Sequence, residues 1–569
     1  MTEAEDNDPI KWSDYFRSTF PILRWLPAYE AKWVQSDFIA GVTLAAYAIP
    51  VSLAYAALAG LPSQAGLYCY LLGGLAYAVF GTSRQLAIGP TSAISMLIGS
   101  ALGGLAAADA ARQAHLATGV AILAGTLGLI AWVLRLGNVM NFISETVLSG
   151  FKVGAGLVIA STQLPKLFGV ASVGGNFFTR IIDLLRHLGD TNPRTLAIGA
   201  AALTLLVLGE WMLPQRPVAL FVVVMSIVFV SLVPMAAEGV KTVGIIPRGL
   251  PNLGWPGVDW GEIDTLLPLA MACFLLSYVE SISVVRTFAV KHRYPVNADQ
   301  ELLALGAANL VAGMGQAYPL AGGMSQSAVN EKGGARTPLA LVFASGCIGL
   351  VLLFLTGVMR NLPEPVLAAV VLMAVKGLID PVELRHLSRV SKMEFRIAIV
   401  AAVGVLAFGI LKGVLLAAVF SILVLLKRAS RPGIATLGQI SGTNRFADCA
   451  RYPDCKQIPR VLVLRIESGL FYFNAENVRL EILNRTRRNR SVGLVVVDLS
   501  TSPNIDLAGS RMFFDLNQEL EQDGVSLKLA EVHGGVRDLL LAEKLDAKIE
   551  AIDRREEVGA LIQRWEMRA

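Results

Sequence analysis

Two short stretches, IGPTS at residues 88–92 and GGMSQS at residues 322–327, decide the fold predicted for this chain. Each one places Gly or Pro at the start of an apolar segment. A helix that begins inside a membrane leaves its first N–H groups without intrahelical partners, and in lipid these groups need protein, water or a bound molecule. Their partial positive charge favours an anion. Two such half-helices facing each other predict an anion-binding site, the alternative being that Gly89-Pro90 only kinks a continuous helix.

The composition around these stretches is that of a membrane protein with a water-soluble tail. Of the 569 residues, 54% are hydrophobic and only 16% are charged, against about a quarter charged in soluble domains. Charges are sparse from about residue 37 to residue 426 and return to a soluble density after about residue 456. The first part is therefore expected to lie in lipid and the second in water.

Fourteen apolar elements are predicted in the first part, since a membrane-spanning helix needs about 20 mostly apolar residues. The clear or nearly complete spans are 37–58, 116–134, 142–164, 195–213, 216–235, 263–285, 338–358, 395–411 and the shorter 412–428. The interrupted or short elements are 66–80, 89–106, 301–316, 324–334 and 363–378. In addition, residues 176–189 are typical of an amphipathic helix lying on the membrane surface.

The order of these elements predicts two inverted repeats of seven. The seventh element ends near Val233, a polar stretch rich in Pro and Gly follows at residues 236–264, and the third element of each half is the interrupted one. Matching broken segments in two halves are typical of secondary transporters. The fold class expected is an α-helical polytopic membrane protein with repeats at about 37–235 and 263–428, followed by a soluble α/β domain.

Charge placement predicts that both termini are cytoplasmic. Basic residues gather on alternate connections, as membrane topology requires, although four residues weaken this pattern: Lys166, Arg180, Arg186 and Arg194. The acidic start, MTEAEDNDPIKW, is unlike a signal peptide. The net charge of +5 is small and lies at the ends of apolar runs, so no nucleic-acid partner is expected.

The C-terminal region alternates strands and helices. Strands are predicted at 459–466, 492–499 and 525–532, and helices at 475–489, 507–523, 535–545 and 554–567, a pattern typical of an α/β domain. The domains expected are a cytoplasmic segment 1–36, a transmembrane region 37–430, a linker 431–456 and the soluble domain 457–569. A Gly-rich phosphate loop and a nucleophile elbow are both missing from the sequence, so an enzyme is not expected.

The five cysteines predict neither a disulfide nor a metal site. Cys69, Cys273 and Cys347 lie in or beside apolar spans, and no His lies near Cys449 and Cys455. Reduced, unpaired thiols are the expectation. No metal and no cofactor other than a coupling ion is predicted.

Several longer motifs resemble the sulfate permease (SulP) family, which includes pendrin and prestin. They are LPSQAGLY at 61–68, FGTSR at 80–84, NADQEL at 297–302, GAAN at 306–309, SQSAVN at 325–330 and GGARTP at 333–338. The tail, with Asp498-Leu499-Ser500 and Ile505-Asp506, resembles the STAS domain that ends these transporters. The resemblance implies fourteen segments divided into a core and a gate domain, an elevator-like motion and a homodimer.

The resemblance also implies which residues contact the anion, between segments 1, 3, 8 and 10. These residues are Tyr55, Pro90, Thr91, Ser92, Glu280, Ser325, Gln326 and Ser327. The hydroxyl groups among them could equally cap their half-helices, and Tyr55 could be a packing aromatic. Two positions depart from the family: many animal relatives have Arg where this chain has Gln326, and Leu507 stands where anti-sigma-antagonist cousins have a phosphorylated Ser.

Glu280 lies inside the apolar segment ACFLLSYVESISVV at 272–285, and a carboxylate at this depth marks a function by default. It could carry a proton, bind Na⁺, or hold core to gate through hydrogen bonds. Because Gln326 adds no charge, Glu280 is expected to face the anion without a matching cation. The anion would then bind well only when H⁺ or Na⁺ neutralises Glu280.

The function predicted is proton-coupled symport of a small anion: sulfate, bicarbonate or a C4-dicarboxylate such as fumarate. The alternatives are Na⁺-coupled bicarbonate uptake, an anion exchanger or channel, and a scaffold whose STAS domain binds a cytoplasmic partner. The expected location is a cell membrane, the bacterial inner membrane, crossed many times.

Overall fold

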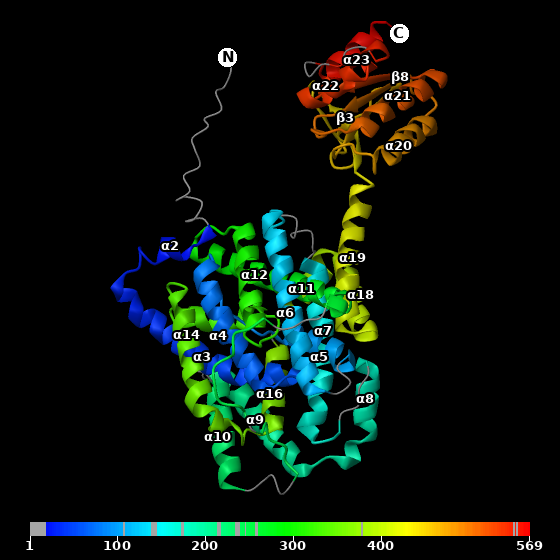
Figure 1. Ribbon diagram of the computed structural model, residues 1–569. Helices are drawn as coiled ribbons and strands as arrows, with labels where there is room; N and C mark the ends of the chain where they lie inside the picture. Colours follow the sequence, from blue (N-terminus) through cyan, green and yellow to red (C-terminus); the bar gives the residue numbers. More distant parts are fainter. Residues whose placement is uncertain are drawn as a thin grey trace. The chain divides into compact units, whose positions relative to one another are not determined.

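The computed structural model has two compact units, Met1–Ser421 and Ile422–Ala569 (Figure 1). It describes residues 19–105, 109–137, 145–171, 176–212, 218–233, 239–244, 246–255, 260–376, 379–549, 552 and 556–568. Residues 1–18 of the expected cytoplasmic segment 1–36 therefore lie outside the described residues. From Ile22, a short helix α2 (Ile22–Trp25) and a 3-10 turn (Ala31–Trp33) lead into the first long helix.

The transmembrane helices fall into two sets of seven. The first set is α3 (Val34–Leu58), α4 (Ser63–Phe80), α5 (Ser92–Leu105), α6 (Ala110–Val133), α7 (Glu145–Phe168), α9 (Pro193–Met212) and α10 (Val218–Leu232). The second is α11 (Trp260–His292), α12 (Ala298–Met314), α13 (Met324–Lys332), α14 (Leu339–Leu350), α16 (Glu364–Lys376), α18 (Lys392–Phe408) and α19 (Ile410–Ala429). A π-helical turn (Val351–Leu355) and α15 (Thr356–Met359) extend α14. By length and composition, 6 helices of the described chain could cross a membrane.

Helix contacts between the two sets come in exchanged pairs. Helix α3 packs on α14 as α11 packs on α6, and α6 packs on α12 as α14 packs on α4. Helix α7 packs on α18 as α16 packs on α9. Exchanging the first and second sets reproduces these contacts, which is the arrangement expected of two repeats related by a two-fold axis.

The two interrupted segments meet at the centre of this unit. Strand β1 (Ile88–Gly89) pairs antiparallel with β2 (Ala321–Gly322), Ile88 opposite Gly322 and Gly89 opposite Ala321. Helices α5 and α13 start directly after these strands. A side chain at Gly89 would have its Cβ 2.4 Å from the Tyr70 ring, so glycine is needed for the close approach. Both segments are therefore half-helices preceded by extended backbone, and Gly89-Pro90 does not merely kink a helix.

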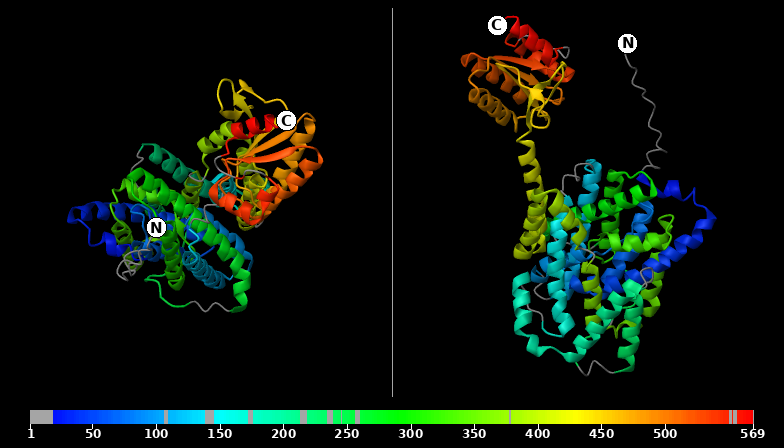
Figure 2. Two further views of the ribbon diagram at one scale, coloured as in Figure 1. Left: turned by 90° about the horizontal axis from the view of Figure 1, so that it is seen from above. Right: turned by 180° about the vertical axis from the view of Figure 1, so that it is seen from behind.

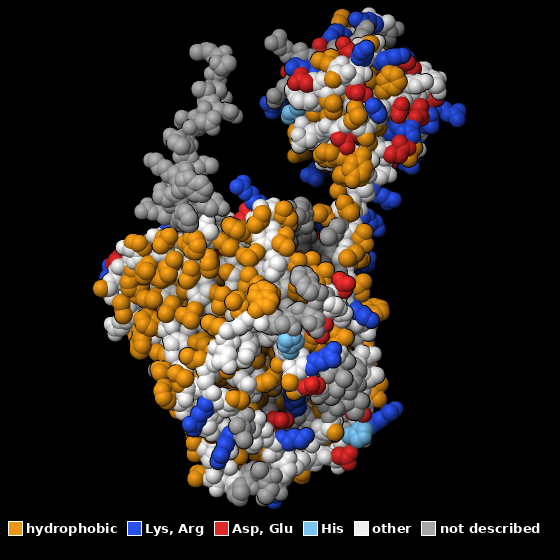
Figure 3. Space-filling model, viewed as in Figure 1, with side chains coloured by type: hydrophobic (Ala, Val, Ile, Leu, Met, Phe, Trp, Pro, Cys, Tyr) orange, Lys and Arg blue, Asp and Glu red, His pale blue; other side chains and the backbone are white. Residues whose placement is uncertain are grey.

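Two amphipathic helices occupy matching places in the two sets. Helix α8 (Phe177–Arg186) has only Leu184 buried, as predicted for residues 176–189. Helix α17 (Pro381–Val390), which sequence analysis missed, has no buried residue and lies between α16 and α18. The outer surface is largely hydrophobic over α3 and α14 (Figure 3), where Phe38 and Phe354 are exposed. This surface suits a lipid environment.

The C-terminal unit is a mixed sheet with helices on both faces (Figure 2). Its strands are β3 (Ile434–Ile440), β4 (Phe446–Asp448), β5 (Cys455–Lys456), β6 (Val461–Ile466), β7 (Leu494–Asp498) and β8 (Ser526–Ala530). The order is β4-β3-β6-β7-β8, with β6, β7 and β8 parallel. Helices α20 (Ala475–Arg488), α21 (Leu507–Gln522) and α22 (Gly534–Ala542) share one core, and α23 (Val558–Glu566) packs on the opposite face.

The expected linker 431–456 is corrected by this sheet. Strand β3 pairs antiparallel with β6, so these residues form part of the soluble fold. The strand was missed because it carries Gly438 in its interior and gains its burial only from partners distant in sequence.

Candidate functional site

A cavity of about 290 Å³ lies at the starts of α5 and α13. Seven of the eight predicted site residues line it: Tyr55, Pro90, Thr91, Ser92, Glu280, Ser325 and Gln326. The eighth, Ser327, is fully buried outside the lining, and its hydroxyl accepts the Ala87 N–H at 2.9 Å. The structure therefore brings α3, both half-helices and α11 to one cavity.

Both half-helices present their first N–H groups to the cavity. The cap residue of α13 is Gly323, and no side chain caps this end within the described chain. At α5, the Thr91 hydroxyl only reaches the Ile94 N–H at 3.5 Å. Other polar side chains of the cavity lining lie close to these hydroxyls: Tyr47 beside Ser325, Tyr55 beside Ser92, and Glu280 beside Thr91. The helix ends thus remain available to an anion.

Gln326 lines the cavity, but its amide is engaged by the protein. Its Nε2 donates to the carbonyls of Ala87 at 3.0 Å and Ala321 at 3.3 Å, and its oxygen accepts a short bond from the Tyr70 hydroxyl. These contacts tie the residue before β1 to β2 and to α4. The Gln326 side chain therefore holds the paired strands β1 and β2 in place.

Glu280 does have a cation beside it, contrary to the expectation from the sequence. Lys152 of α7 lines the same cavity, and its charge acts on the buried Glu280 carboxylate. Lys152 lies in the predicted span 142–164, whose first residues lie outside the described chain. A lysine inside an apolar span indicates a functional site for the same reason that Glu280 does. Lys152 could therefore have been predicted from the sequence.

Two further carboxylates, Asp380 and Glu383, lie at the rim of the cavity and are exposed. Asp380 caps α17 by accepting the N–H groups of Val382 and Glu383. Sequence analysis missed both residues because it missed α17. Among the described residues, no group of three or more His, Cys, Asp or Glu side chains is arranged to hold a metal ion.

Polar side chains of α11 and α12 fix the backbone of β2 beside Glu280. The Ser281 hydroxyl accepts the Gly322 N–H at 2.7 Å, and the Ser277 hydroxyl donates to the Leu320 carbonyl at 2.6 Å. Asn309 both donates to Leu320 and accepts from it. Because Ser277 and Ser281 flank Glu280 on α11, the carboxylate is held in register with the start of α13.

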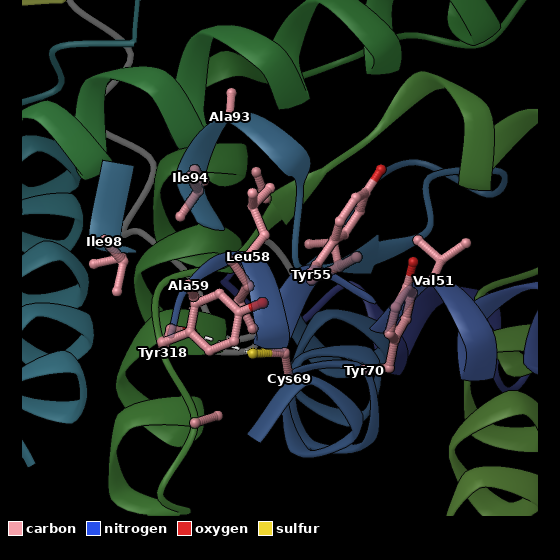
Figure 4. Close-up of a cluster of buried hydrophobic side chains, with 14 of the residues drawn as sticks. Val51, Tyr55, Leu58, Ala59, Cys69, Tyr70, Ala93, Ile94, Ile98 and Tyr318 are labelled. Carbon is pink, nitrogen blue, oxygen red and sulfur yellow. Dashed lines mark hydrogen bonds between the residues drawn. The ribbon is translucent and has the colours of Figure 1, made fainter. Parts of the chain in front are cut away.

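A hydrophobic cluster packs residues of α5 against α3 and α4, and Figure 4 shows some of its side chains. It includes Val51, Tyr55, Leu58, Cys69, Tyr70, Ile94, Ile98 and Tyr318. The Cys69 thiol donates to the Tyr318 carbonyl, and the Tyr318 and Ser95 hydroxyls are 3.0 Å apart. The half-helix α5 is thus held rigidly against α3 and α4.

In the C-terminal unit, Asp506 is committed to structure. Its carboxylate caps α21 by accepting the Gly509 N–H and also accepts the Tyr472 N–H at 2.7 Å. Leu507, the first residue of α21, is exposed. No hydroxyl stands at this position to accept a phosphate.

Comparison with known proteins assigns both units. The model of the sulfate permease family matches residues 34–401, and that of the STAS domain matches residues 452–558. The Mycobacterium tuberculosis protein named "Probable sulfate transporter Rv1739c" is 33% identical over 522 residues, covering 92% of this chain and 93% of the relative. The Arabidopsis thaliana "Sulfate transporter 4.1, chloroplastic" is 30% identical over 554 residues, covering 91% and 78%.

Solved structures share the fold. That of murine Slc26a9, an anion transporter in the inward-facing state, matches with a TM-score of 0.89 at 23% identity, covering 99% of this chain and 97% of that one. The transmembrane domain of the cyanobacterium bicarbonate transporter BicA matches with a TM-score of 0.60 at 23% identity, covering 69% and 98%. A polytopic helical fold with a C-terminal STAS domain is confirmed, and so is a transporter rather than an enzyme.

Proposed function

The chain belongs to the sulfate permease family, and we propose that it takes up a small divalent oxyanion, sulfate first, together with a proton carried by Glu280. The relatives named above support sulfate as the substrate. The similarity to BicA supports bicarbonate as an alternative substrate. A C4-dicarboxylate such as fumarate carries the same charge as sulfate. The cavity residues offer hydroxyls, helix N-termini and one lysine to such a ligand.

The observation that carries the proposal is that Glu280 and Lys152 share one cavity with the starts of α5 and α13. While Glu280 is ionised, it neutralises Lys152 and repels an anion. A proton on Glu280 removes the repulsion and leaves Lys152 free to bind the anion beside Thr91 and Ser325. Proton and anion therefore bind together, which is the requirement for symport. This proposal keeps the proton coupling that the sequence predicts but changes its physical cause. Protonation of Glu280 frees Lys152 to bind the anion, whereas the sequence suggests a site with no cation.

The two charged residues stand on different helix groups. Glu280 lies on α11, which packs on α5, α6 and α12, whereas Lys152 lies on α7, which packs most extensively on α16 and α18 and also contacts α9 and α5. We assign the first group to the core domain and the second to the gate. An elevator-like movement of core against gate would change the Glu280–Lys152 distance and thus release the anion on the other side.

Na⁺-coupled bicarbonate uptake is the second candidate, favoured by the three carboxylates around the cavity: Glu280, Asp380 and Glu383. An exchanger or channel differs from both candidates in that it cannot concentrate an anion without an opposing gradient. The location proposed is the bacterial inner membrane with both termini cytoplasmic. We further propose a homodimer and a cytoplasmic partner for the STAS domain.

The test is uptake of radiolabelled sulfate, bicarbonate and fumarate by purified protein in proteoliposomes, under an inward proton gradient, an inward Na⁺ gradient or neither. Sulfate is expected to accumulate above equilibrium only with the proton gradient. Accumulation driven by Na⁺ alone supports the second candidate, and equilibration without accumulation supports a channel. The variants Thr91→Ala and Ser325→Ala should lose uptake at unchanged expression. If the protein is a transport-inactive scaffold, the wild type should show no uptake either.

A further inference from the structure

Two cysteines of the C-terminal unit stand at the two ends of one exposed loop, residues 450–454. Strand β4, before the loop, pairs with one edge of β3, as shown by Leu437 opposite Asp448. Strand β5, after the loop, pairs with the other edge, with Ile440 opposite Cys455. One residue of a strand faces two partner strands only when they lie on its two sides. Leu437 faces both β4 and β6, and Gln439 faces both β4 and β5, so β4 lies on one edge of β3 while β5 and β6 lie on the other. The chain therefore crosses over β3 between Cys449 and Cys455.

Both cysteine side chains project onto the same face of β3. The Cys449 N–H donates to the Thr436 carbonyl at 3.0 Å, which places Cys449 opposite Thr436, and Cys455 is opposite Ile440. Residues 436, 438 and 440 of a strand share one face. Gly438 therefore lies between the two cysteines, on the face that the loop crosses.

Gly438 leaves the space in which the two side chains meet. A Cβ at this position would be 2.7 Å from the Cys449 sulfur and 3.0 Å from the Cys455 Cβ. The Cys449 sulfur and the Cys455 Cβ are therefore less than about 6 Å apart, and rotation of the two side chains with a small shift of the exposed loop brings the sulfurs within reach of the disulfide bond length of about 2.05 Å. Any larger residue at 438 would separate them.

We propose that Cys449 and Cys455 form an oxidisable dithiol site that closes to a disulfide over Gly438. With hydrogen peroxide as oxidant, one thiolate attacks a peroxide oxygen and the O–O bond breaks. The sulfur becomes a sulfenic acid, and the departing hydroxide takes up a proton as water. The second thiolate attacks the sulfenic sulfur, the S–S bond forms, and hydroxide leaves and takes up a proton as water. The two sulfurs are oxidised and one peroxide is reduced. This inference is independent of the transport function proposed above.

The site should be selective within the chain. All five cysteines are free thiols, but Cys69 and Cys273 are fully buried, whereas Cys449 and Cys455 are partly exposed beside an exposed loop. Desolvation, and then the nearby Cys449 and Asp454, raise the pKa of Cys455 above its ordinary value, with Asp448 acting in the same direction. Oxidation is therefore expected to quicken as the pH rises from 7 to 9, as the thiolate fraction grows.

The experiment uses the full chain in detergent, treated with hydrogen peroxide and compared with a sample reduced again by dithiothreitol. Free thiols per unfolded chain should fall from five by two, and peptide mapping should find Cys449 joined to Cys455. The substitution Gly438→Ala should lower the yield at least several-fold while both cysteines remain. Gly535→Ala, at an exposed and open position of the same unit, is its control. Cys347→Ser should leave the yield of the Cys449–Cys455 disulfide unchanged.

A second measurement keeps the proposal testable if Gly438→Ala disturbs folding. Dibromobimane becomes fluorescent when it bridges two neighbouring thiols, so the reduced wild type should react with it and Cys455→Ser should not. Failure of the wild type both to bridge and to form the disulfide overturns the proposal. A disulfide formed between chains, or one that Gly438→Ala leaves at full yield, also overturns it.

Discussion

Replacing Gln326 by Leu should damage the site without removing a contact to the anion. The change deprives the buried carbonyls of Ala87 and Ala321 of a donor and the Tyr70 hydroxyl of its acceptor. Each buried polar group left unpaired costs about 1–3 kcal/mol, so we expect a loss of about 2–5 kcal/mol after some relaxation. The pairing of β1 with β2 should loosen, because the Gln326 side chain joins β2 and the residue before β1 to α4.

The assay combines thermal unfolding in detergent with initial rates of uptake for sulfate and a monovalent anion. Gln326→Leu should lower the unfolding midpoint by roughly 5 °C and lower the uptake rates of both anions in parallel. Val329→Ile, an apolar exchange on the same half-helix outside the cavity lining, is the matched control and should change neither. A variant with unchanged midpoint but altered preference between the anions would refute the positioning role and make Gln326 a direct ligand.

Two further predictions test the charges and the packing. Lys152→Met should raise the half-saturating sulfate concentration about 30- to 150-fold, because one charge several Å from the anion contributes about 2–3 kcal/mol at an effective dielectric constant near 20. Lys166→Met, on the same helix but outside the cavity lining, should not raise it, and equal effects of the two variants would contradict the role of Lys152. Gly66→Ala should destabilise the chain by about 1–3 kcal/mol or more, since its Cβ would lie 2.1 Å from the Ser52 carbonyl oxygen, whereas Gly346→Ala, with no atom within 4 Å, should leave the unfolding midpoint unchanged or slightly raised.

Much of the transmembrane unit could be predicted because lipid imposes a simple rule on sequence. Most helices between α3 and α19 appear as apolar runs, and the half-helices are marked by Gly89-Pro90 and Gly322-Gly323. Their side chains must be apolar and their backbone must be broken by residues that tolerate it. These local requirements are visible without any tertiary contact.

The features that the sequence did not reveal depend on partners far along the chain. Gln326 is engaged by Tyr70, 256 residues away, and β3 is a strand only when β6 lies beside it. Helix α17 is polar and short, so it lacks the apolar run on which the other helices were recognised. Lys152 is different, because the sequence shows its charge inside an apolar span. Its role near the anion became clear only because it lines the same cavity as Glu280.

The central claim is that a proton on Glu280 drives accumulation of the anion. Wild type, Glu280→Gln and the control Glu262→Gln, a carboxylate of the same helix outside the cavity lining, are compared in proteoliposomes with an alkaline interior. Wild type and Glu262→Gln should concentrate sulfate in proportion to the imposed pH difference, and Glu280→Gln should bind sulfate yet only equilibrate it. Accumulation by Glu280→Gln as steep as that of wild type would contradict the account.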